Sequence, residues 1–527
     1  MREMVIKTLR AIISEEVSIE AITPENETFG HYSTNVAFRL AKIRGTSPRV
    51  IAEDLAKILL AKKIFPRVEV AGNGFLNIWL SHETLEGVVK EIIKKKKNFG
   101  KKKLPRAIQQ KIQVEFISAN PTGPLTLANG RGGFLGDALS NVLEAAGHQV
   151  EREYYVNDTG NQVRTLGLSL LAAQGTISNE ENFYQGEYVK EWAKKNATIV
   201  KKYANKPEVL GTKAATYFLK LIKSAVEKKA GIHFDRYTSE AKDIHVKHFA
   251  EKALTLFKKK GFVYESEGAE WLKTTEFGDD KDRVLITREK LPTYFLVDAG
   301  HYLETKERKF TTKIIILGPD HYGYVKRIQA AASILELGHS EVLITQAVRL
   351  VRGGEEVKMS KRSGTFVTFE DLVEDVGGDV ARFFFLMISP DTHMDFDLDL
   401  AKEQSLKNPV FYAQYAVVRT AGIIKKARVP KGKIELNLLT SDEDIRLITK
   451  LAAFPEVIED TAKDFAVHRM TRYALDLAKA FHTFYEKERV GGVEPNIARA
   501  RLELVKATQI VISNLFLLLG ISTPKKM

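Results

Sequence analysis

The sequence predicts an α/β protein whose central domain is built on a doubly wound parallel sheet, with an α+β domain before it and an all-α helical bundle after it. Strand-like and helix-like runs alternate from about residue 106 to 395, which is typical of a parallel sheet covered by helices. From about residue 405 strand signals fade and apolar residues recur at helical spacing. A length of 527 residues also exceeds what one hydrophobic core accommodates, so several domains are expected.

Residues 1–92 are predicted to form the α+β domain. The segment "SPRVIAEDLAKILLA" begins with Ser47 as a helix cap and Pro48 at the first helical position, followed by an apolar stripe. The segment "RVEVAGNGFLNIWLS" holds two short strand-like runs around a pair of glycines, which predicts a hairpin. Residues 93–105 contain seven lysines and little to bury, so we expect a linker whose lysines could also contact phosphate.

Residues 106–395 are predicted to form the central domain, and residues 396–527 the bundle. The candidate strands of the central sheet are "KIQVEFIS", "EREYYVND", "KIIILGPD" and "EVLITQAV". In the bundle, aromatic and aliphatic residues recur at three- and four-residue spacing. The last helix is expected from about Asn496 to Leu519, with Gly520 at its C-cap.

Composition narrows the class of protein. With 44% apolar and 28% charged residues the chain reads as soluble and globular, and its longest apolar runs fall short of a membrane span. The absence of cysteine excludes disulfides and thiolate zinc sites and fits a reducing cytosol. The first 16 residues show no secretory cleavage pattern. We therefore expect a cytoplasmic protein without membrane attachment. A net charge of +13 suits a nucleic-acid partner, although solvated lysines alone also produce it.

A glycine-rich turn, "PTGPLTLANGRGG", spans residues 121–133 between a strand-like run and a helix-like run that starts at Phe134. Glycine lets a backbone approach a ligand closely, and the first N–H groups of a helix are free donors for phosphate. The P-loop pattern is absent, and Leu135 stands where the dinucleotide fingerprint needs its third glycine. The turn therefore predicts either a phosphate site or a plain tight turn.

A second segment, "VKMSKRSGTF" (residues 357–366), alternates Lys358, Lys361 and Arg362 with small polar residues. Ammonium groups in such a loop can clamp a triphosphate and follow charge as it develops. Taken alone, such a charge cluster is more often a solvated loop.

Together the two segments resemble the signature pair of class I aminoacyl-tRNA synthetases, an HxGH turn after the first strand and a KMSKS loop after the last. The surrounding sequence resembles arginyl-tRNA synthetases almost throughout. The resemblance includes "GHYSTNVAFRLAK" near the start, "LPTYFLVDAGHYLETKERKF" and "IIILGPDHYGYVKRIQAA" in the centre, and "YALDLAKAFHTFYEKERV" near the end.

The resemblance implies ATP-dependent ligation of L-arginine to tRNA(Arg) through an arginyl-adenylate, with release of AMP and pyrophosphate. It also implies a Rossmann-like catalytic domain with a connective insertion, an N-terminal domain that contacts tRNA, and a C-terminal bundle that binds the anticodon. ATP is expected with Mg²⁺ held chiefly by the phosphates, without a protein metal site and without zinc. We expect a monomer. The two signatures lie too close together for a long editing insertion.

The same resemblance places six residues in the amino-acid pocket. Carboxylates suit this ligand because a guanidinium offers a fork of donors and a permanent charge. Glu115 could instead be a structural acid paired with an arginine, Tyr294 a half-buried core residue, and His321 an ordinary surface histidine. The predicted arginine-binding residues are Glu115, Ser118, Asn120, Tyr294, Asp298 and His321.

At the ATP site the sequence departs from the family, because Thr126-Leu127-Ala128-Asn129 replaces His-x-Gly-His. Thr126 and Asn129 can donate hydrogen bonds but cannot become cationic, and losing a charge-assisted donor costs about 1.5–3 kcal/mol. Our hypothesis is that Lys358 and Lys361 carry more of the transition-state stabilisation. The predicted catalytic residues are Thr126, Asn129, Lys358 and Lys361, and the predicted ATP-binding residues are Pro121, Gly123, Pro124, Leu127, Gly130, Gly132, Met359 and Ser360.

Asp158, Gly160 and Gln162 follow the second strand, where open sheets bind ligands, and are given a supporting role around the substrates or the tRNA end. A plain turn with Asp158 as a helix N-cap is the alternative. Two other functions stay open: an adenylate-forming ligase or nucleotidyltransferase that does not use tRNA, and a non-catalytic RNA-binding relative.

Overall fold

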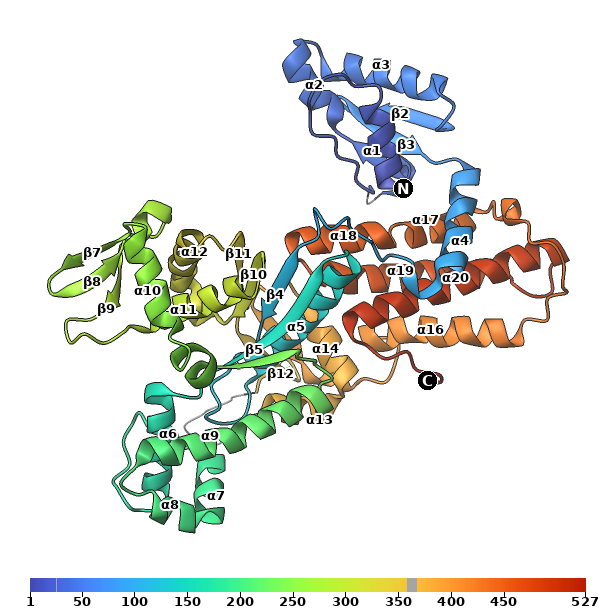
Figure 1. Ribbon diagram of the computed structural model, residues 1–527. Coiled ribbons are helices and arrows are strands. Elements are labelled where there is room, and N and C mark those ends of the chain that lie inside the picture. Colours follow the sequence, from blue (N-terminus) through green and yellow to red (C-terminus); the bar gives the residue numbers. More distant parts are fainter. Residues whose placement is uncertain (25, 358–366) are drawn as a thin grey trace.

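The structure is a computed structural model that describes residues 1–24, 26–357 and 367–527 (Figure 1). Its centre is a five-stranded sheet in the order β11-β10-β4-β5-β6, and every neighbouring pair is parallel. The predicted parallel sheet and its four candidate strands are confirmed, while the short polar strand β6 was missed. The strands are β4 (Lys111–Glu115), β5 (Gln149–Val156), β6 (Arg236–Ser239), β10 (Thr312–Leu317) and β11 (His339–Ile344).

Helices cover both faces of this sheet, as a doubly wound fold requires. Ile314 and Ile316 of β10 face the core that contains α5 (Leu127–Ala145), whereas Ile315 between them faces the core of α11 (Tyr294–Glu307) and α12 (Val325–Ile334). Successive side chains of a strand point to opposite faces, so one strand supplies both cores.

Helix α5 begins at Leu127, seven residues earlier than predicted, so half of the expected open turn is helical. Glycine disfavours a helix, but here it lets the helix lie close to its neighbours. A Cβ on Gly130 would lie 2.2 Å from the ring of Phe369, and one on Gly136 would lie 2.2 Å from Phe116. These two glycines therefore allow Phe369 and Phe116 to pack directly against the backbone of α5.

Replacing Gly130 with alanine is expected to lower the melting temperature of the central domain, because the new methyl group collides with Phe369. Overpacking of this kind costs about 1–3 kcal/mol. Gly132→Ala is the matched control, since its Cβ would lie 3.5 Å from Ile316, an ordinary contact. Differential scanning calorimetry should show a lower transition only for Gly130→Ala, and equal transitions for the two variants would contradict this packing role.

The N-terminal region is an antiparallel sheet with helices against it, and it stands apart from the central sheet (Figure 1). The predicted hairpin and the positions of Ser47 and Pro48 are confirmed, although the Ser47 side chain makes no capping hydrogen bond. The elements are α1 (Arg2–Arg10), β1 (Tyr32–Thr34), α2 (Val36–Arg44), α3 (Pro48–Ala61), β2 (Arg67–Ala71) and β3 (Phe75–Trp79).

The lysine-rich segment is more ordered than a free linker. Helix α4 (His82–Lys95) continues into it and packs against two helices of the C-terminal bundle, α17 (Asp442–Ala452) and α20 (Pro495–Leu519). Phe99 is buried and stacks on Phe454, with ring centroids 6.3 Å apart. Part of this segment therefore joins the N-terminal region to the bundle through apolar contact.

Two insertions interrupt the central sheet. Four helices stand between β5 and β6, namely α6 (Gly160–Ala173), α7 (Glu187–Lys195), α8 (Ala197–Lys202) and α9 (Pro207–Lys223). Helix α10 (Phe249–Lys259) and a small antiparallel sheet stand between β6 and β10, the strands being β7 (Val263–Ser266), β8 (Ala269–Leu272) and β9 (Arg283–Ile286). After β11 come β12 (Val348–Arg352), β13 (Glu355–Glu356), α13 (Phe369–Val376), α14 (Gly378–Met387), β14 (Met394–Asp397) and α15 (Leu398–Lys402).

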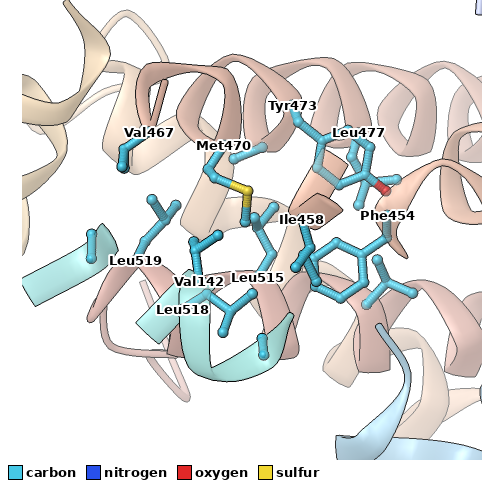
Figure 2. Close-up of a cluster of buried hydrophobic side chains, with 14 of the residues drawn as sticks. Val142, Phe454, Ile458, Val467, Met470, Tyr473, Leu477, Leu515, Leu518 and Leu519 are labelled. Carbon is cyan, nitrogen blue, oxygen red and sulfur yellow. The ribbon is translucent and has the colours of Figure 1, made fainter. Parts of the chain in front are cut away.

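The C-terminal region is the predicted helical bundle, formed by α16 (Pro409–Lys426), α17 (Asp442–Ala452), α18 (Phe454–Asp464), α19 (His468–Lys487) and α20 (Pro495–Leu519). Figure 2 shows Val142 of α5 among Met470, Leu515 and Leu518, so the bundle shares an apolar core with the central domain. Helix α20 is long and apolar enough to cross a membrane by length and composition alone, but 56% of that window is buried in the protein. Gly520 ends it in a left-handed C-cap, as predicted.

Candidate active site

A cluster of acids lies at the carboxyl ends of β4 and β6, the edge where open α/β sheets bind ligands. Glu115 is the last residue of β4, Glu240 follows β6 directly, and Asp298 lies one turn into α11. Glu115 and Glu240 are buried, and Asp298 is half-buried. Sequence reasoning found Glu115 and Asp298 but missed Glu240, because its local sequence carries no motif.

The carboxyl group of Asp298 has a raised pKa. Burial raises its pKa to about 6, and the neighbouring charges of Glu240 and Glu115 act in the same direction. A hydrogen bond from the Tyr324 hydroxyl and the electrostatic effect of the nearby His301 oppose this rise. Among the described residues, no lysine or arginine lies within ion-pair distance of Asp298 or Glu240. The group therefore sits in an anionic environment that a cation would relieve.

Two aromatic side chains line the same acids. The Tyr155 ring stacks on His301 with centroids 4.3 Å apart, and its hydroxyl donates to Glu240 Oε2 at 3.0 Å. Burial, followed by the charge of Glu240, holds the Tyr155 pKa well above its usual range, so the phenol stays a donor. The result is a wall of acids and rings of the type that accepts a planar cation.

Glu115 and Ser118 form one unit. Ser118 Oγ donates to Glu115 Oε1 at 3.1 Å and accepts the backbone N–H of Tyr155 at 3.0 Å. Ile117 and Ser118 have φ values of 64° and 40°, a left-handed conformation that costs a β-branched residue strain. The alternative for Glu115 was an arginine partner; the cation observed beside it is Lys313, whose Nζ lies 2.9 Å from Glu115 Oε2.

The other predicted arginine-binding residues are more exposed. Asn120 donates to Gln162 Oε1. Tyr294 is the first residue of α11, so it and Asp298 are one helical turn apart, and its side chain is 65% exposed. His321 lies in a 3₁₀ turn after β10, with its Nε2 3.5 Å from Asp320. Asn120 follows β4 and His321 follows β10, whereas Tyr294 begins α11, the helix that precedes β10.

Asp158 is not the N-cap of α6, which is Thr159. Its carboxylate instead accepts the Ser239 hydroxyl at 2.6 Å and the backbone N–H of Ala241 at 3.0 Å. Asp158 therefore ties the end of β5 to the end of β6, next to Glu240. Gly160 has a φ of 77° at the start of α6, which favours glycine.

Thr126 and Asn129 form a reciprocal capping box at the start of α5. Asn129 N–H donates to Thr126 Oγ1 at 3.3 Å, and Asn129 Oδ1 accepts the Thr126 N–H at 2.9 Å and its hydroxyl at 2.8 Å. The Thr126 hydroxyl is thus directed inward, contrary to our expectation of a free donor. Within the described parts of the chain, the Asn129 amide NH₂ makes no hydrogen bond and remains available.

The residues of the first signature surround the start of this helix. Gly123 lies under the ring of Tyr188 from the insertion, where a Cβ would approach to 2.7 Å. Pro121, Leu127 and Gly130 are buried, and Pro124 and Gly132 lie in the same segment. The predicted residues of the second signature, Lys358, Met359, Ser360 and Lys361, lie outside the described residues.

The described chain on both sides of that second signature is anchored. Val357 N–H donates to Leu350 O at 2.9 Å, and Phe369 N–H donates to Leu125 O at 3.0 Å beside the Gly130 contact. The downstream anchor therefore lies against the first signature helix.

Glu153, His301 and Glu304 converge closely enough to hold a metal ion. Cations already compensate these acids, since Arg308 Nη1 lies 2.6 Å from Glu153 Oε2 and Arg236 Nη2 lies 3.1 Å from Glu304 Oε1. The donor set therefore fits a buried ionic network better than a metal site.

Three sequence families cover most of the chain. Residues 88–382, more than half of it, match "tRNA synthetases class I (R), catalytic domain". Residues 1–80 match "Arginyl tRNA synthetase N terminal domain", and residues 413–527 match "DALR anticodon binding domain". With the parallel sheet and the signature at its first strand, these matches define a class I aminoacyl-tRNA synthetase.

Relatives and solved structures narrow the class. The arginine–tRNA ligase of Syntrophotalea carbinolica is 39% identical over 97% of this chain and 95% of its own, and that of Desulforamulus reducens is 41% identical over 97% and 94%. The arginyl-tRNA synthetase of Thermus thermophilus, 20% identical, has the same fold with a TM-score of 0.81 over 100% of this chain and 99% of its own. The chain belongs to the arginyl-tRNA synthetase family and is an arginine–tRNA ligase. The two alternative functions are thereby set aside.

Proposed function

We propose that this ligase binds the guanidinium group of arginine between Asp298, Glu115 and Glu240, with Tyr155 beside it. The observation that carries this assignment is the pair of acids, Asp298 and Glu240, that have no lysine or arginine partner among the described residues. Tyr324 donates to Asp298, and Tyr155 and His245 contact Glu240, but these contacts offset only part of the cost of desolvating two carboxylates. A guanidinium supplies the missing charge and a fork of donors that fits two carboxylates.

The remaining predicted residues are assigned to the α-amino group of arginine and to its α-carboxylate group, which is the group that reacts. Ser118 and Asn120 follow β4, and Tyr294 and His321 are exposed residues at the start of α11 and in the turn after β10. Their donors and acceptors suit an α-amino and an α-carboxylate group. Selection through such hydrogen bonds needs no hydrolytic proofreading, because a ligand without the matching groups leaves buried acids unpaired.

ATP is assigned to the turn before α5 and to the Lys358–Lys361 segment. The free N–H groups of a helix start, together with the Asn129 amide, suit phosphate oxygens. Thr126 and Asn129 carry no charge, so the positive charge that stabilises the transition state is assigned to Lys358 and Lys361. Mg²⁺ is expected to arrive with ATP and to be held chiefly by its phosphates.

We further propose that tRNA(Arg) contacts residues 1–92 and the bundle of residues 396–527. The segment 93–105 joins residues 1–92 to the catalytic domain of residues 106–395, and the bundle follows that domain directly. The basic balance of the chain supports this assignment, because phosphate contacts supply much of the affinity for nucleic acid. The ligase is expected to act as a monomer in the cytoplasm, where its tRNA substrate is found.

The pH dependence of arginine use tests the pocket. Folding raises the pKa of Asp298 from its ordinary value of 3.8 to about 6, so the protonated form stabilises the fold at low pH, and this contribution is lost as the pH rises through about 6. Above about pH 6 the carboxylate is charged, and a bound cation would offset that loss. Below about pH 6 a growing fraction of Asp298 is protonated, and the arginine KM should rise by up to about tenfold per pH unit.

The measurement is arginine-dependent ATP–pyrophosphate exchange with tRNA present, between about pH 5 and 8. The ATP KM serves as the internal control and should change much less. An arginine KM that stays flat across this range would remove Asp298 from the pocket.

A further inference from the structure

A lysine lies fully buried beneath the acid cluster. Lys313, the second residue of β10, has no exposed surface. Burying an ammonium group costs free energy unless opposite charge and hydrogen-bond acceptors compensate it. The neighbours of Lys313 therefore indicate its role. Its Nζ lies 2.9 Å from Glu115 Oε2, donates to Gln113 Oε1, and is 3.4 Å from Thr305 Oγ1.

Sheet register brings this lysine to Glu115. Strands β10 and β4 are parallel, with Lys313 opposite Gln113 and Ile315 opposite Glu115. Residues two apart on a strand share a face, so the side chain of Lys313 lies on the face of Glu115. Its four-carbon stem carries the ammonium towards the carboxyl edge, under the acid.

Glu115 depends on this one cation. Its Oε2 is buried and makes no hydrogen bond within the described residues, and its Oε1 accepts the Ser118 hydroxyl. In the same part of the chain, Lys313 is the only lysine or arginine within ion-pair distance of it, and His301 Nδ1 is 3.8 Å away. The two half-buried arginines nearby pair with other acids: Arg308 contacts Glu151, Glu153 and Glu304, and Arg236 lies nearest to Glu304.

We propose that Lys313 is a positioning residue for arginine recognition, holding Glu115 as an oriented carboxylate beneath the proposed arginine site without touching the ligand. This inference rests on the proposed place of Glu115 in the arginine site. One oxygen of Glu115 is fixed by the ammonium and the other by Ser118, so the carboxyl plane cannot rotate freely. A fixed carboxylate loses less entropy when it binds a planar guanidinium.

The positive charge of Lys313 also keeps Glu115 in its ionised form. Without it, Glu115 becomes a buried carboxylate with no lysine or arginine within ion-pair distance among the described residues, and burial without such a partner favours the protonated form of a carboxyl group. A protonated Glu115 no longer attracts the guanidinium. The titratable and charged groups that face Lys313 and Glu115 from the surrounding strands and helices are Glu153, Glu240, Asp298, Glu304, His301, Tyr155, Tyr302, Arg236 and Arg308.

The test is the arginine KM of Lys313→Met and Lys313→Gln across pH, by ATP–pyrophosphate exchange with tRNA present. We expect an increase of at least about tenfold near pH 7 that shrinks towards pH 9 as Glu115 ionises, with the ATP KM within about twofold of the parent. Lys313→Arg keeps the charge, so its arginine KM should rise less than that of Lys313→Met. Lys306→Met is the matched control, because Lys306 of α11 contacts Leu335 O and Glu336 instead.

A double-mutant cycle separates positioning from general destabilisation. In a Glu115→Gln background, Lys313→Met should change the arginine KM less than about twofold, because its target is gone. An equal rise with and without Glu115, or a rise that does not depend on pH, would overturn the role of Lys313. If Lys313→Met does not fold, Lys313→Gln carries the same cycle. An unchanged arginine KM in Glu115→Gln alone would instead refute the site assignment itself, and the role of Lys313 with it.

Discussion

Replacing Asp298 with asparagine should lower kcat/KM for arginine by at least about 100-fold. The change keeps the size of the side chain but removes its charge and one of its acceptors. A hydrogen bond to a charged group is worth about 1.5–3 kcal/mol, and a guanidinium fork makes two such bonds, so the loss reaches this magnitude. The effect should appear mainly in the arginine KM, because the acid binds a part of the substrate that does not react.

Arginine-dependent ATP–pyrophosphate exchange measures this loss. Glu307→Gln is the matched control, since Glu307 is an exposed acid on the same helix, α11. The control should keep its activity within about twofold of the parent. A loss of less than about threefold in Asp298→Asn would show that the guanidinium is bound elsewhere.

Replacing Lys361 with alanine should lower the rate of arginine activation at least about 100-fold. Removing one preorganised donor from a site of charge development typically costs about 2.7–4 kcal/mol. The first signature cannot compensate for this loss, because Thr126 and Asn129 are neutral and the Thr126 hydroxyl is directed into the capping box. Here the rate constant should fall more than the affinity for arginine.

Single-turnover formation of the adenylate, measured at saturating arginine and ATP, isolates this step. Lys402→Ala is a suitable control, because Lys402 is a half-exposed lysine that pairs with Asp375 at 2.6 Å. A decrease of less than about threefold in Lys361→Ala would place the catalytic charge on another group.

The main architecture could be read from the sequence because its signals are local. Alternating apolar runs marked β4, β5, β10 and β11, and Gly520 marked the end of α20. Strand β6 (Arg236–Ser239) was missed because four polar residues carry no periodic pattern. The start of α5 was placed too late because glycine signals a turn locally, and only the approach of Phe369 explains Gly130 within a helix.

The candidate site could be predicted only in part. Glu115 and Asp298 stand in recognisable motifs, and the structure brings both to one edge of the sheet. Glu240, Tyr324 and Lys313 were missed because their roles arise from strand register and helix packing across long separations in the chain. A lysine in an apolar run such as "KIIIL" gives no sign that it lies under an acid of the neighbouring strand.

Calorimetric titration of arginine and citrulline into the ligase tests the central claim most directly. Citrulline has nearly the shape of arginine, but its urea group carries no charge. The acid cluster predicts that the parent protein binds arginine at least about 100-fold more tightly than citrulline, and that this preference falls below about tenfold in Asp298→Asn. Citrulline binding within about threefold of arginine in the parent protein would contradict a pocket built from carboxylates.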